Sequence, residues 1–331
     1  MIGPVVISLN SPHSFWSLGE SHLARLRSEF PGLDVRAVAD DELPGALADA
    51  EVYFGWRFEP HWLPQAPRLK WIATPAAGTD HLPVEEVTRC GTILTRSYGF
   101  HRQPMAEHAM GMILTFSRGL LLSSRLQRTR RWWKGELAAE FFDLAGATML
   151  IVGCGSVGTH LAAMGRTFGM NVIGVRRTLP TGPRAGIDWV PATRWRHALP
   201  VADVVVNLLP ATAETAHLFD ASSFASFKAG SVFVNLGRGA TVDHAALLAA
   251  LDSGRLRGAG LDVTDPRPLP RRHPLRKHPR VLLTPKTGVF SHSYMDCAVR
   301  FFADNMHSYL AGLPLRGTAE AVHLIPTEGP S

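Results

Sequence analysis

The sequence contains few cysteines and no long apolar run. Its three cysteines, Cys90, Cys154 and Cys297, are too few and too scattered for a disulfide framework or a zinc cluster. Every apolar run is shorter than the roughly 18 residues that a membrane-spanning helix needs. We therefore expect a soluble globular protein whose cysteines are reduced and structural, and no membrane partner.

The amino terminus lacks the features of a targeting segment. An apolar, strand-like run over residues 5–9 begins almost at once, and no basic flank precedes it. This pattern predicts neither a signal peptide nor a transit peptide. We expect a cytoplasmic protein.

Clustered positive charge is also missing. The formal net charge is +6, but the 34 Lys and Arg residues are spread along the chain without a long basic tract. This distribution disfavours nucleic acid as a partner and favours an anionic small molecule. Lysine itself is scarce, with only Lys70, Lys134, Lys228, Lys277 and Lys286 among the basic residues.

Length and residue pattern predict two α/β domains. The 331 residues, 46% of them hydrophobic, amount to about twice a typical domain. In the first hundred residues, short apolar runs alternate with polar helical stretches, at 5–9, 35–39, 52–56, 69–73 and 92–95. A predicted helix over 104–131 comes next, then strands at 148–152, 172–175, 204–208, 232–236, 259–263 and 281–284, and a last helix at 293–310. This alternation predicts a small parallel sheet and a larger, doubly wound one.

A glycine-rich loop follows the first strand of the second series. It reads Gly153-Cys154-Gly155-Ser156-Val157-Gly158 and opens an apolar helix. The first glycine allows a tight turn, the second lets a pyrophosphate approach the backbone, and the third lets the helix pack on the strand. The candidate cofactor-binding residues of this loop are Gly153, Gly155, Ser156, Val157 and Gly158. The alternative is a glycine-rich turn that binds no ligand.

Arginines stand where NAD-binding domains of this type carry a carboxylate. After the second strand the chain reads Arg176-Arg177-Thr178, without an acidic residue for the ribose 2′-hydroxyl. Guanidinium groups suit a 2′-phosphate, because they form charge-assisted, often bidentate bonds to it. We infer NADP(H) rather than NAD(H) as the cofactor. The alternative is that Arg176 and Arg177 are solvated surface charges.

Six ordered motifs resemble one enzyme family. They are Ala76-Ala77-Gly78-Thr79-Asp80, Met105-Ala106-Glu107-His108, the glycine loop, Val234-Asn235-Leu236-Gly237-Arg238-Gly239, Gly260-Leu261-Asp262-Val263 and Val281-Leu282-Leu283-Thr284-Pro285. In order and spacing the chain resembles the D-isomer-specific 2-hydroxyacid dehydrogenases, above all their glyoxylate/hydroxypyruvate reductase branch.

The resemblance implies a domain architecture. A Rossmann domain over residues 101–289 is expected to be inserted into a smaller flavodoxin-like α/β substrate domain, made of residues 1–100 and 290–331. The resemblance also implies a homodimer, and Arg130-Arg131-Trp132-Trp133 is similar to a stretch that contributes dimer contacts. A plain surface helix is the alternative for that segment.

The resemblance also implies roles for individual residues. Arg238 would anchor the substrate carboxylate, and Asp262 would bond the nicotinamide carboxamide unless it is simply a buried structural residue. The implied substrate-binding residues are Arg238, Ala77 and Gly78, together with Trp56 and Arg57. The further cofactor-binding residues are Leu209, Pro210, Leu236 and Gly288.

Two catalytic positions depart from the family pattern. Lys286 stands where the family has its acid/base histidine, and Arg267 stands where it has the supporting glutamate. With Arg238, the pocket would hold three cations, and their repulsion would favour loss of a proton from the lysine because arginine keeps its own. Lys286 could then serve as the acid/base, form a Schiff base, or act only electrostatically. His292 is a weaker candidate for the missing acid.

Three functions remain open at this point. The first is an NADP(H)-dependent oxidoreductase of a small anionic 2-oxo or 2-hydroxy acid, including a dianion such as a phosphonate or dicarboxylate. The second is altered, lysine-dependent chemistry that uses bound nicotinamide. The third is a non-catalytic dinucleotide sensor, since the fold also resembles corepressors that bind NAD(H).

Overall fold

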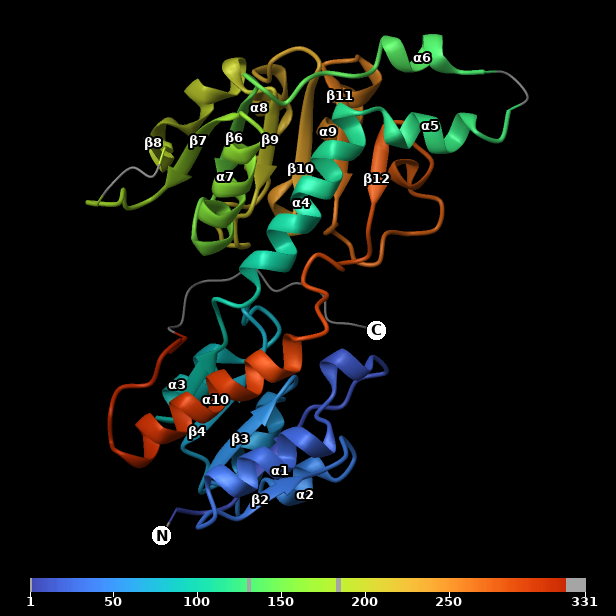
Figure 1. The fold of residues 1–331 in the computed structure, drawn as a ribbon. Coiled ribbons are helices and arrows are strands. Elements are labelled where there is room, and N and C mark those ends of the chain that lie inside the picture. The colour runs from blue at the N-terminus through green and yellow to red at the C-terminus, as the bar shows by residue number, and fades with distance from the viewer. Residues whose placement is uncertain (1, 130–131, 183–185, 320–331) are drawn as a thin grey trace. The chain divides into compact units, whose positions relative to one another are not determined.

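The computed structural model describes residues 2–129, 132–182 and 186–319, which form two compact units. One unit comprises residues 2–101 and 290–319, and the other is built from residues 102–289. Each unit holds one parallel β-sheet with helices packed on it (Figure 1). Within the described residues, the chain has no helix long and apolar enough to cross a membrane.

The smaller unit has a five-stranded sheet. Its strands are β1 (Val5–Ser8), β2 (Val35–Ala37), β3 (Val52–Gly55), β4 (Trp71–Thr74) and β5 (Ile93–Arg96), in the order β2-β1-β3-β4-β5. Its helices are η1 (Ser14–Trp16), α1 (Glu20–Glu29), α2 (Leu43–Ala46), η2 (Pro60–Gln65), α3 (Val84–Arg89) and α10 (Tyr294–Leu310). This strand order is flavodoxin-like. The sheet is built outward in one direction from β1 to β2 and in the other direction from β3 to β5, so the topological switch point lies between β1 and β3. The five expected strands and the last helix are present.

The chain returns to the smaller unit through α10. Phe302 of this helix stacks on Phe54 of β3, with ring centroids 4.3 Å apart, and on Trp71 of β4 at 5.2 Å. Burial of three aromatic rings ties the carboxyl-terminal segment to the amino-terminal sheet.

The larger unit has a seven-stranded sheet. Its strands are β6 (Thr148–Val152), β7 (Asn171–Arg176), β8 (Asp188–Pro191), β9 (Val204–Asn207), β10 (Ser231–Asn235), β11 (Leu256–Leu261) and β12 (Val281–Leu283), in the order β12-β11-β10-β9-β6-β7-β8. Its helices are α4 (Arg102–Ser117), α5 (Leu120–Leu126), α6 (Lys134–Ala138), α7 (Ser156–Thr167), η3 (Ala192–Val201), α8 (Ala221–Ala225), η4 (Gly239–Thr241), α9 (His244–Asp252) and η5 (Pro274–Arg276). The expected doubly wound fold is confirmed, and β8 is a seventh strand that the sequence did not predict.

The helical stretch expected over 104–131 is divided into two helices. The helix α4 ends at Ser117, and Gly119 then adopts a left-handed conformation with φ of 64° before α5 begins at Leu120. Glycine tolerates this conformation, which commonly ends helices. Arg130 and Arg131 of the expected dimer segment lie outside the described residues.

Two glycines let α4 pack directly on β11. A Cβ atom at Gly260 would lie 2.8 Å from Met112 Sδ, and one at Gly258 would clash with the ring of Phe116. Real Cβ atoms essentially never approach neighbours so closely, so a side chain at either strand position would displace Met112 or Phe116. The close packing holds α4 at a fixed register along β11.

Candidate functional site

The glycine loop between β6 and α7 has the geometry of a dinucleotide-binding turn. Gly153 has a φ of +88°, and a Cβ there would lie 3.0 Å from the Leu208 carbonyl carbon. A Cβ on Gly158 would lie 3.0 Å from Ile151 Cγ2, so this glycine lets α7 pack on β6. Gly155 is exposed, and a Cβ there would meet no protein atom closer than 4.0 Å. The loop therefore leaves open space where a ligand can approach the backbone.

The amino terminus of α7 also fits a bound phosphate. This helix has 12 residues and begins at Ser156, and no side chain caps it. The first N–H groups of a helix have no partner within the helix, and they carry its positive dipole end. Ser156 and Val157 lie in this first turn, so the residues present fit the pyrophosphate of a dinucleotide.

The two arginines at the end of β7 and directly after it lie beside the glycine loop. The Cys154 N–H donates to the Val175 carbonyl at 2.8 Å, which joins the loop to the end of β7. Arg176 lies with its guanidinium carbon 5.8 Å from the Trp189 ring centroid, and Arg177 is exposed. Burial raises the pKa of the Cys154 thiol to about 12, even though the Arg176 charge acts to lower it. That cysteine is therefore an unreactive structural thiol, as the sequence suggested.

A buried polar network shapes the turn that carries Arg238. Asn207 donates to Asn235 Oδ1 at 3.0 Å and to Thr241 Oγ1 at 2.7 Å, and all three residues are fully buried. Thr241 Oγ1 donates in turn to the Arg238 carbonyl at 2.6 Å, and the Gly237 N–H donates to Asn235 Oδ1 at 3.0 Å. These bonds fix the backbone at the end of β10 where Arg238 begins its turn. Sequence analysis missed this network; its only signal was an asparagine ending each of two apolar strands.

Other predicted cofactor residues lie at the same edge of the sheet. Leu209 and Pro210 follow β9, and the Leu209 N–H donates to Asn207 Oδ1 at 3.1 Å. A Cβ on Gly237 would lie 2.5 Å from the Leu209 carbonyl oxygen, so the ends of β9 and β10 approach closely. Leu236 is buried immediately after β10.

Asp262 holds the loop that carries Lys286. Its buried carboxylate accepts hydrogen bonds from Thr284 Oγ1 at 2.6 Å, the Thr287 N–H at 2.8 Å and the Gly288 N–H at 3.0 Å. Its main-chain oxygen accepts the Lys286 N–H at 2.8 Å. A Cβ on Gly288 would lie 2.9 Å from Asp262 Oδ2, so this position needs glycine. Asp262 is thus a buried residue with a structural role in holding this loop. Its bond to a nicotinamide stays a prediction.

Three cationic residues follow three neighbouring strands. Arg238 comes after β10, Arg267 after β11 and Lys286 after β12, and these strands are adjacent in the sheet. A Cβ on Gly239 would clash with the backbone of Thr264, so the Arg238 turn packs directly on the segment that leads to Arg267. Arg267 itself is exposed. The structure therefore brings together the three loops that carry the predicted catalytic residues.

In the smaller unit, the predicted substrate residues follow β3 and β4. His81 Nε2 lies 3.1 Å from the Trp56 carbonyl, which links the two loops. Arg96, at the end of β5, donates from Nη1 to the Ala77 carbonyl at 3.1 Å, a positioning contact that sequence analysis missed. Within the described chain, no backbone acceptor takes the N–H of Ala77 or Gly78. Two such adjacent N–H groups can bind a carboxylate.

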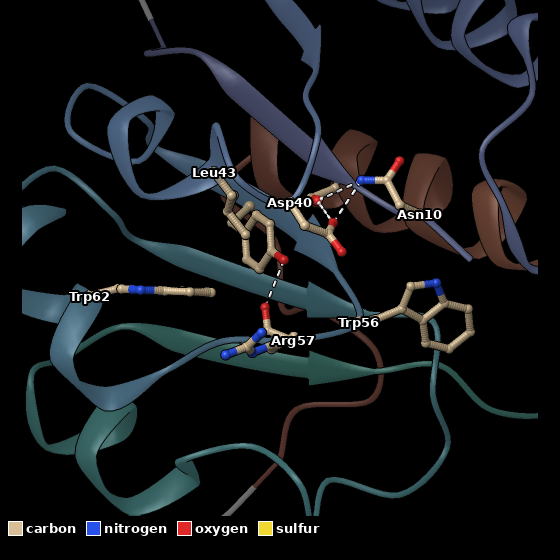
Figure 2. Close-up of a pocket in the computed structure, with 8 residues that line it drawn as sticks. Asn10, Asp40, Leu43, Trp56, Arg57 and Trp62 are labelled. Carbon is tan, nitrogen blue, oxygen red and sulfur yellow. Dashed lines mark hydrogen bonds between the residues drawn. The ribbon is translucent and has the colours of Figure 1, made fainter. Parts of the chain in front are cut away.

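Arg57 and Trp56 border a small pocket above β1 and β3 (Figure 2). The pocket has a volume of about 30 Å³, enough for roughly two water molecules. Arg57 is paired with Glu59, Nε to Oε1 at 2.7 Å, and its guanidinium lies over Trp62. Across the pocket, Asp40 Oδ1 accepts hydrogen bonds from Ser8 and Asn10 at 2.7 Å each, as Figure 2 shows. The substrate role of Arg57 stays a prediction.

His292 belongs to the smaller unit, whereas Lys286 belongs to the larger one. The His292 ring is exposed and lies 6.5 Å from the Phe15 ring, centroid to centroid. A role for His292 as the acid stays a prediction.

Comparisons with known proteins find relatives in one enzyme family. Residues 110–288 match the family model of the D-isomer specific 2-hydroxyacid dehydrogenase NAD-binding domain. A glyoxylate reductase of Korarchaeum cryptofilum is 30% identical over 253 residues, 75% of each chain. A D-isomer specific 2-hydroxyacid dehydrogenase of Xanthobacter autotrophicus, solved with NADPH and MES, is 28% identical with a TM-score of 0.81 over 97% of this chain and 98% of that one. An NADPH-dependent glyoxylate/hydroxypyruvate reductase of Sinorhizobium meliloti, solved with NADP and sulfate, is 26% identical with a TM-score of 0.80 over 96% and 98%.

Proposed function

The chain belongs to the D-isomer specific 2-hydroxyacid dehydrogenase family, and from this we propose an NADP(H)-dependent oxidoreductase of a small anionic 2-oxo or 2-hydroxy acid. The observation that carries the proposal is the row of loops after β10, β11 and β12, which bear Arg238, Arg267 and Lys286. In doubly wound sheets, ligands bind at this carboxyl edge. When bound, the nicotinamide supplies or takes the hydride.

The choice of NADP(H) rests on the turn after β7. Arg176, Arg177 and Thr178 lie beside the glycine loop and offer two cations and a hydroxyl to a 2′-phosphate. Stacking on Trp189 orients Arg176 without neutralising its charge. Two structural relatives, from Xanthobacter and Sinorhizobium, were solved with NADPH or NADP, which agrees with this choice.

The substrate is anchored by Arg238. Its guanidinium fork suits a carboxylate, and the buried Asn207–Asn235–Thr241 network fixes the backbone from which the side chain leaves. Two more cations on adjoining loops favour a second negative charge on the substrate. Dicarboxylates and phosphonates therefore fit this site better than glyoxylate does.

Lys286 holds or releases the proton of the substrate oxygen. It occupies the position of the family histidine, on a loop that Asp262 fixes. An ammonium group can donate to the carbonyl oxygen during reduction, and an amine can accept the hydroxyl proton in the reverse direction.

A substrate screen with cofactor titration tests the proposal. NADPH oxidation is followed with glyoxylate, hydroxypyruvate, oxaloacetate and phosphonopyruvate, and NADPH binding is measured in parallel. We expect turnover with at least one dianion at a higher kcat/KM than with glyoxylate. Tight NADPH binding without any turnover would instead favour the non-catalytic sensor, and a product bound covalently to Lys286 would favour Schiff-base chemistry.

The same proposal includes a homodimer. Leu120, Trp132 and Phe141 are 52%, 81% and 48% exposed around α5 and α6, which extend beyond the sheet of their unit (Figure 1). Large apolar side chains exposed along a projecting segment agree with an interface. Light scattering after size exclusion should give twice the chain mass, and Trp132→Asp should shift it towards the monomer. A wild-type monomer at micromolar concentration contradicts the proposal.

A further inference from the structure

One face of α4 matches one face of β11 step by step. His108, Met112 and Phe116 are spaced by four residues, so they lie in a row along the helix, about 6 Å apart. Alternate residues of a strand are about 6.6 Å apart on one face. Phe116 and Met112 lie against the two glycines of β11, and the next step along the strand is Asp262. His108 accordingly reaches it, with Nε2 3.5 Å from Asp262 Oδ1.

A directed hydrogen-bond chain connects these residues. Thr284 Oγ1 donates its only hydrogen to Asp262 Oδ1 at 2.6 Å, because a carboxylate accepts and does not donate. Thr284 must therefore accept from His108, whose Nε2 lies 3.0 Å from Oγ1. The histidine carries its hydrogen on Nε2, and the order of donation is His108 to Thr284 to Asp262.

The far end of this chain is the Lys286 loop. The same carboxylate accepts the N–H groups of Thr287 and Gly288, at 2.8 and 3.0 Å. Lys286 lies between Thr284 and Thr287, which both bond to this carboxylate, and it has a φ of +56°. This conformation costs a non-glycine residue energy and persists only where its surroundings enforce it.

We propose that His108 is a positioning residue for Lys286, acting through Thr284 and the Asp262 carboxylate. The inference rests on the proposed function, in which Lys286 handles the substrate proton. His108 orients the Thr284 hydroxyl, that hydroxyl and the two N–H groups fix the carboxylate, and the carboxylate fixes the lysine loop. Since α4 is held on β11 by close packing, the anchor of this chain is rigid.

Amide hydrogen exchange of Thr287 and Gly288 tests the network without using activity. Thr284→Val keeps the side-chain shape and removes the hydroxyl, whereas Thr284→Ser keeps the hydroxyl. We expect the valine variant to exchange these two amides at least about tenfold faster than the native protein, and the serine variant to stay close to native. Thr115→Val on α4 is the matched control, because the Thr115 hydroxyl bonds only within its own helix.

Kinetics separate a positioning role from a merely structural one. Thr284→Val breaks the hydrogen-bond chain, which displaces Lys286 but leaves Arg238 in place. The kcat should therefore fall about tenfold, while KM changes about twofold or less. The pair His108→Gln and His108→Leu gives a second, independent test, because glutamine retains an N–H donor and should restore most of kcat. The control Thr115→Val should match the native protein in both measurements.

The outcomes distinguish this inference from the proposed function. Native exchange rates in both Thr284→Val and His108→Leu overturn the network, whatever the activity. Fast exchange with an unchanged kcat overturns the positioning role. If Lys286→Ala keeps full turnover, the proposed function of the lysine fails, and the exchange data still decide whether the network exists.

Discussion

The main-chain oxygen of Asp262 accepts a hydrogen bond from the N–H of Lys286 at 2.8 Å. This bond and the side-chain bonds of Asp262 hold Lys286 in the left-handed region, with φ of +56°. A lysine pays a conformational cost there that glycine does not. Backbone strain of this kind is often found at functional sites, and it agrees with the proposed role of the Lys286 amine.

Relief of that strain gives a first prediction. Lys286→Gly and Lys286→Ala both remove the amine, but only glycine adopts this φ without a steric cost. We expect the glycine variant to be more stable than the alanine variant by about 1 kcal/mol, and both to lose activity. Urea denaturation followed by circular dichroism measures the difference. Equal stability of the two variants would show that the loop relaxes without the lysine.

The second prediction concerns the cofactor. NADPH should bind at least about tenfold more tightly than NADH, because a charge-assisted bond to the 2′-phosphate contributes more than about 1.4 kcal/mol. Arg176→Ala should remove most of this preference. Arg196→Ala is the matched control, since Arg196 also lies beside a tryptophan, Trp195, but on η3. Fluorescence titration decides, and equal affinities for the two nucleotides contradict the prediction.

The third prediction concerns the substrate anchor. Arg238→Lys keeps the charge and loses the fork, so substrate KM should rise by about tenfold or more while NADPH affinity stays within about twofold. Steady-state kinetics and cofactor titration measure the two effects. Native KM in this variant means that the substrate carboxylate binds elsewhere.

A fourth prediction is pH-dependent. Asp220 caps α8 by accepting the Ser223 N–H at 2.8 Å. Burial acts to raise the pKa of Asp220, but the hydrogen bonds of Ser223 and Ser222 and the Arg196 charge outweigh it and lower the pKa to about 2. Because the folded-state pKa lies below the unfolded value of 3.8, the stabilisation is complete above that value and is lost as the pH falls towards 2.

The cap can be tested by substitution. Asp220→Ala should lower the free energy of unfolding by about 1 kcal/mol at neutral pH, and the difference from the native protein should shrink between pH 4 and about 2. Asp143→Asn is the control, because the Asp143 side chain is 75% exposed and caps no helix. A difference that stays constant with pH would contradict the titration of Asp220.

Much of the fold could be predicted because each strand of the core is a short apolar run. The strand β8 was missed because Asp188-Trp189-Val190-Pro191 is an edge strand with a polar start and a proline end. The break after α4 was missed because the apolar spacing continues past Gly119, and only the backbone shows that this glycine is left-handed.

Only those parts of the candidate site that belong to a sequence motif could be predicted. The glycine loop and Arg238 follow from sequence context, since each comes directly after a strand. The bonds of Asn207 to Asn235 and of His108 to Thr284 join residues 28 and 176 positions apart. No local pattern contains such pairs, because they exist only once β9 lies beside β10 and α4 lies on β11.

The last prediction concerns Lys286 and Arg267, which we propose stand in place of the family's histidine and glutamate. If Lys286 transfers the proton, Lys286→Ala should lower turnover by about two orders of magnitude or more while NADPH still binds, since a general acid contributes about 10²- to 10⁴-fold. Restoration of the family pattern with Lys286→His and Arg267→Glu should shift preference from dianions towards glyoxylate, because it removes surplus positive charge.

The single changes should do less than the double one. Glutamate at position 267 without the histidine would pair with Lys286 and keep it protonated, so Arg267→Glu alone should not restore an acid/base that titrates near neutral pH. Histidine without the glutamate would lack its orienting partner. A double-mutant cycle on kcat/KM for glyoxylate and for a dianion measures this coupling, and the loops of the two residues adjoin at neighbouring strands, where coupling is expected. Additive effects, or an unchanged rate in Lys286→Ala, would remove the lysine from the chemistry and leave Arg238 as the anchor of a site whose acid lies elsewhere.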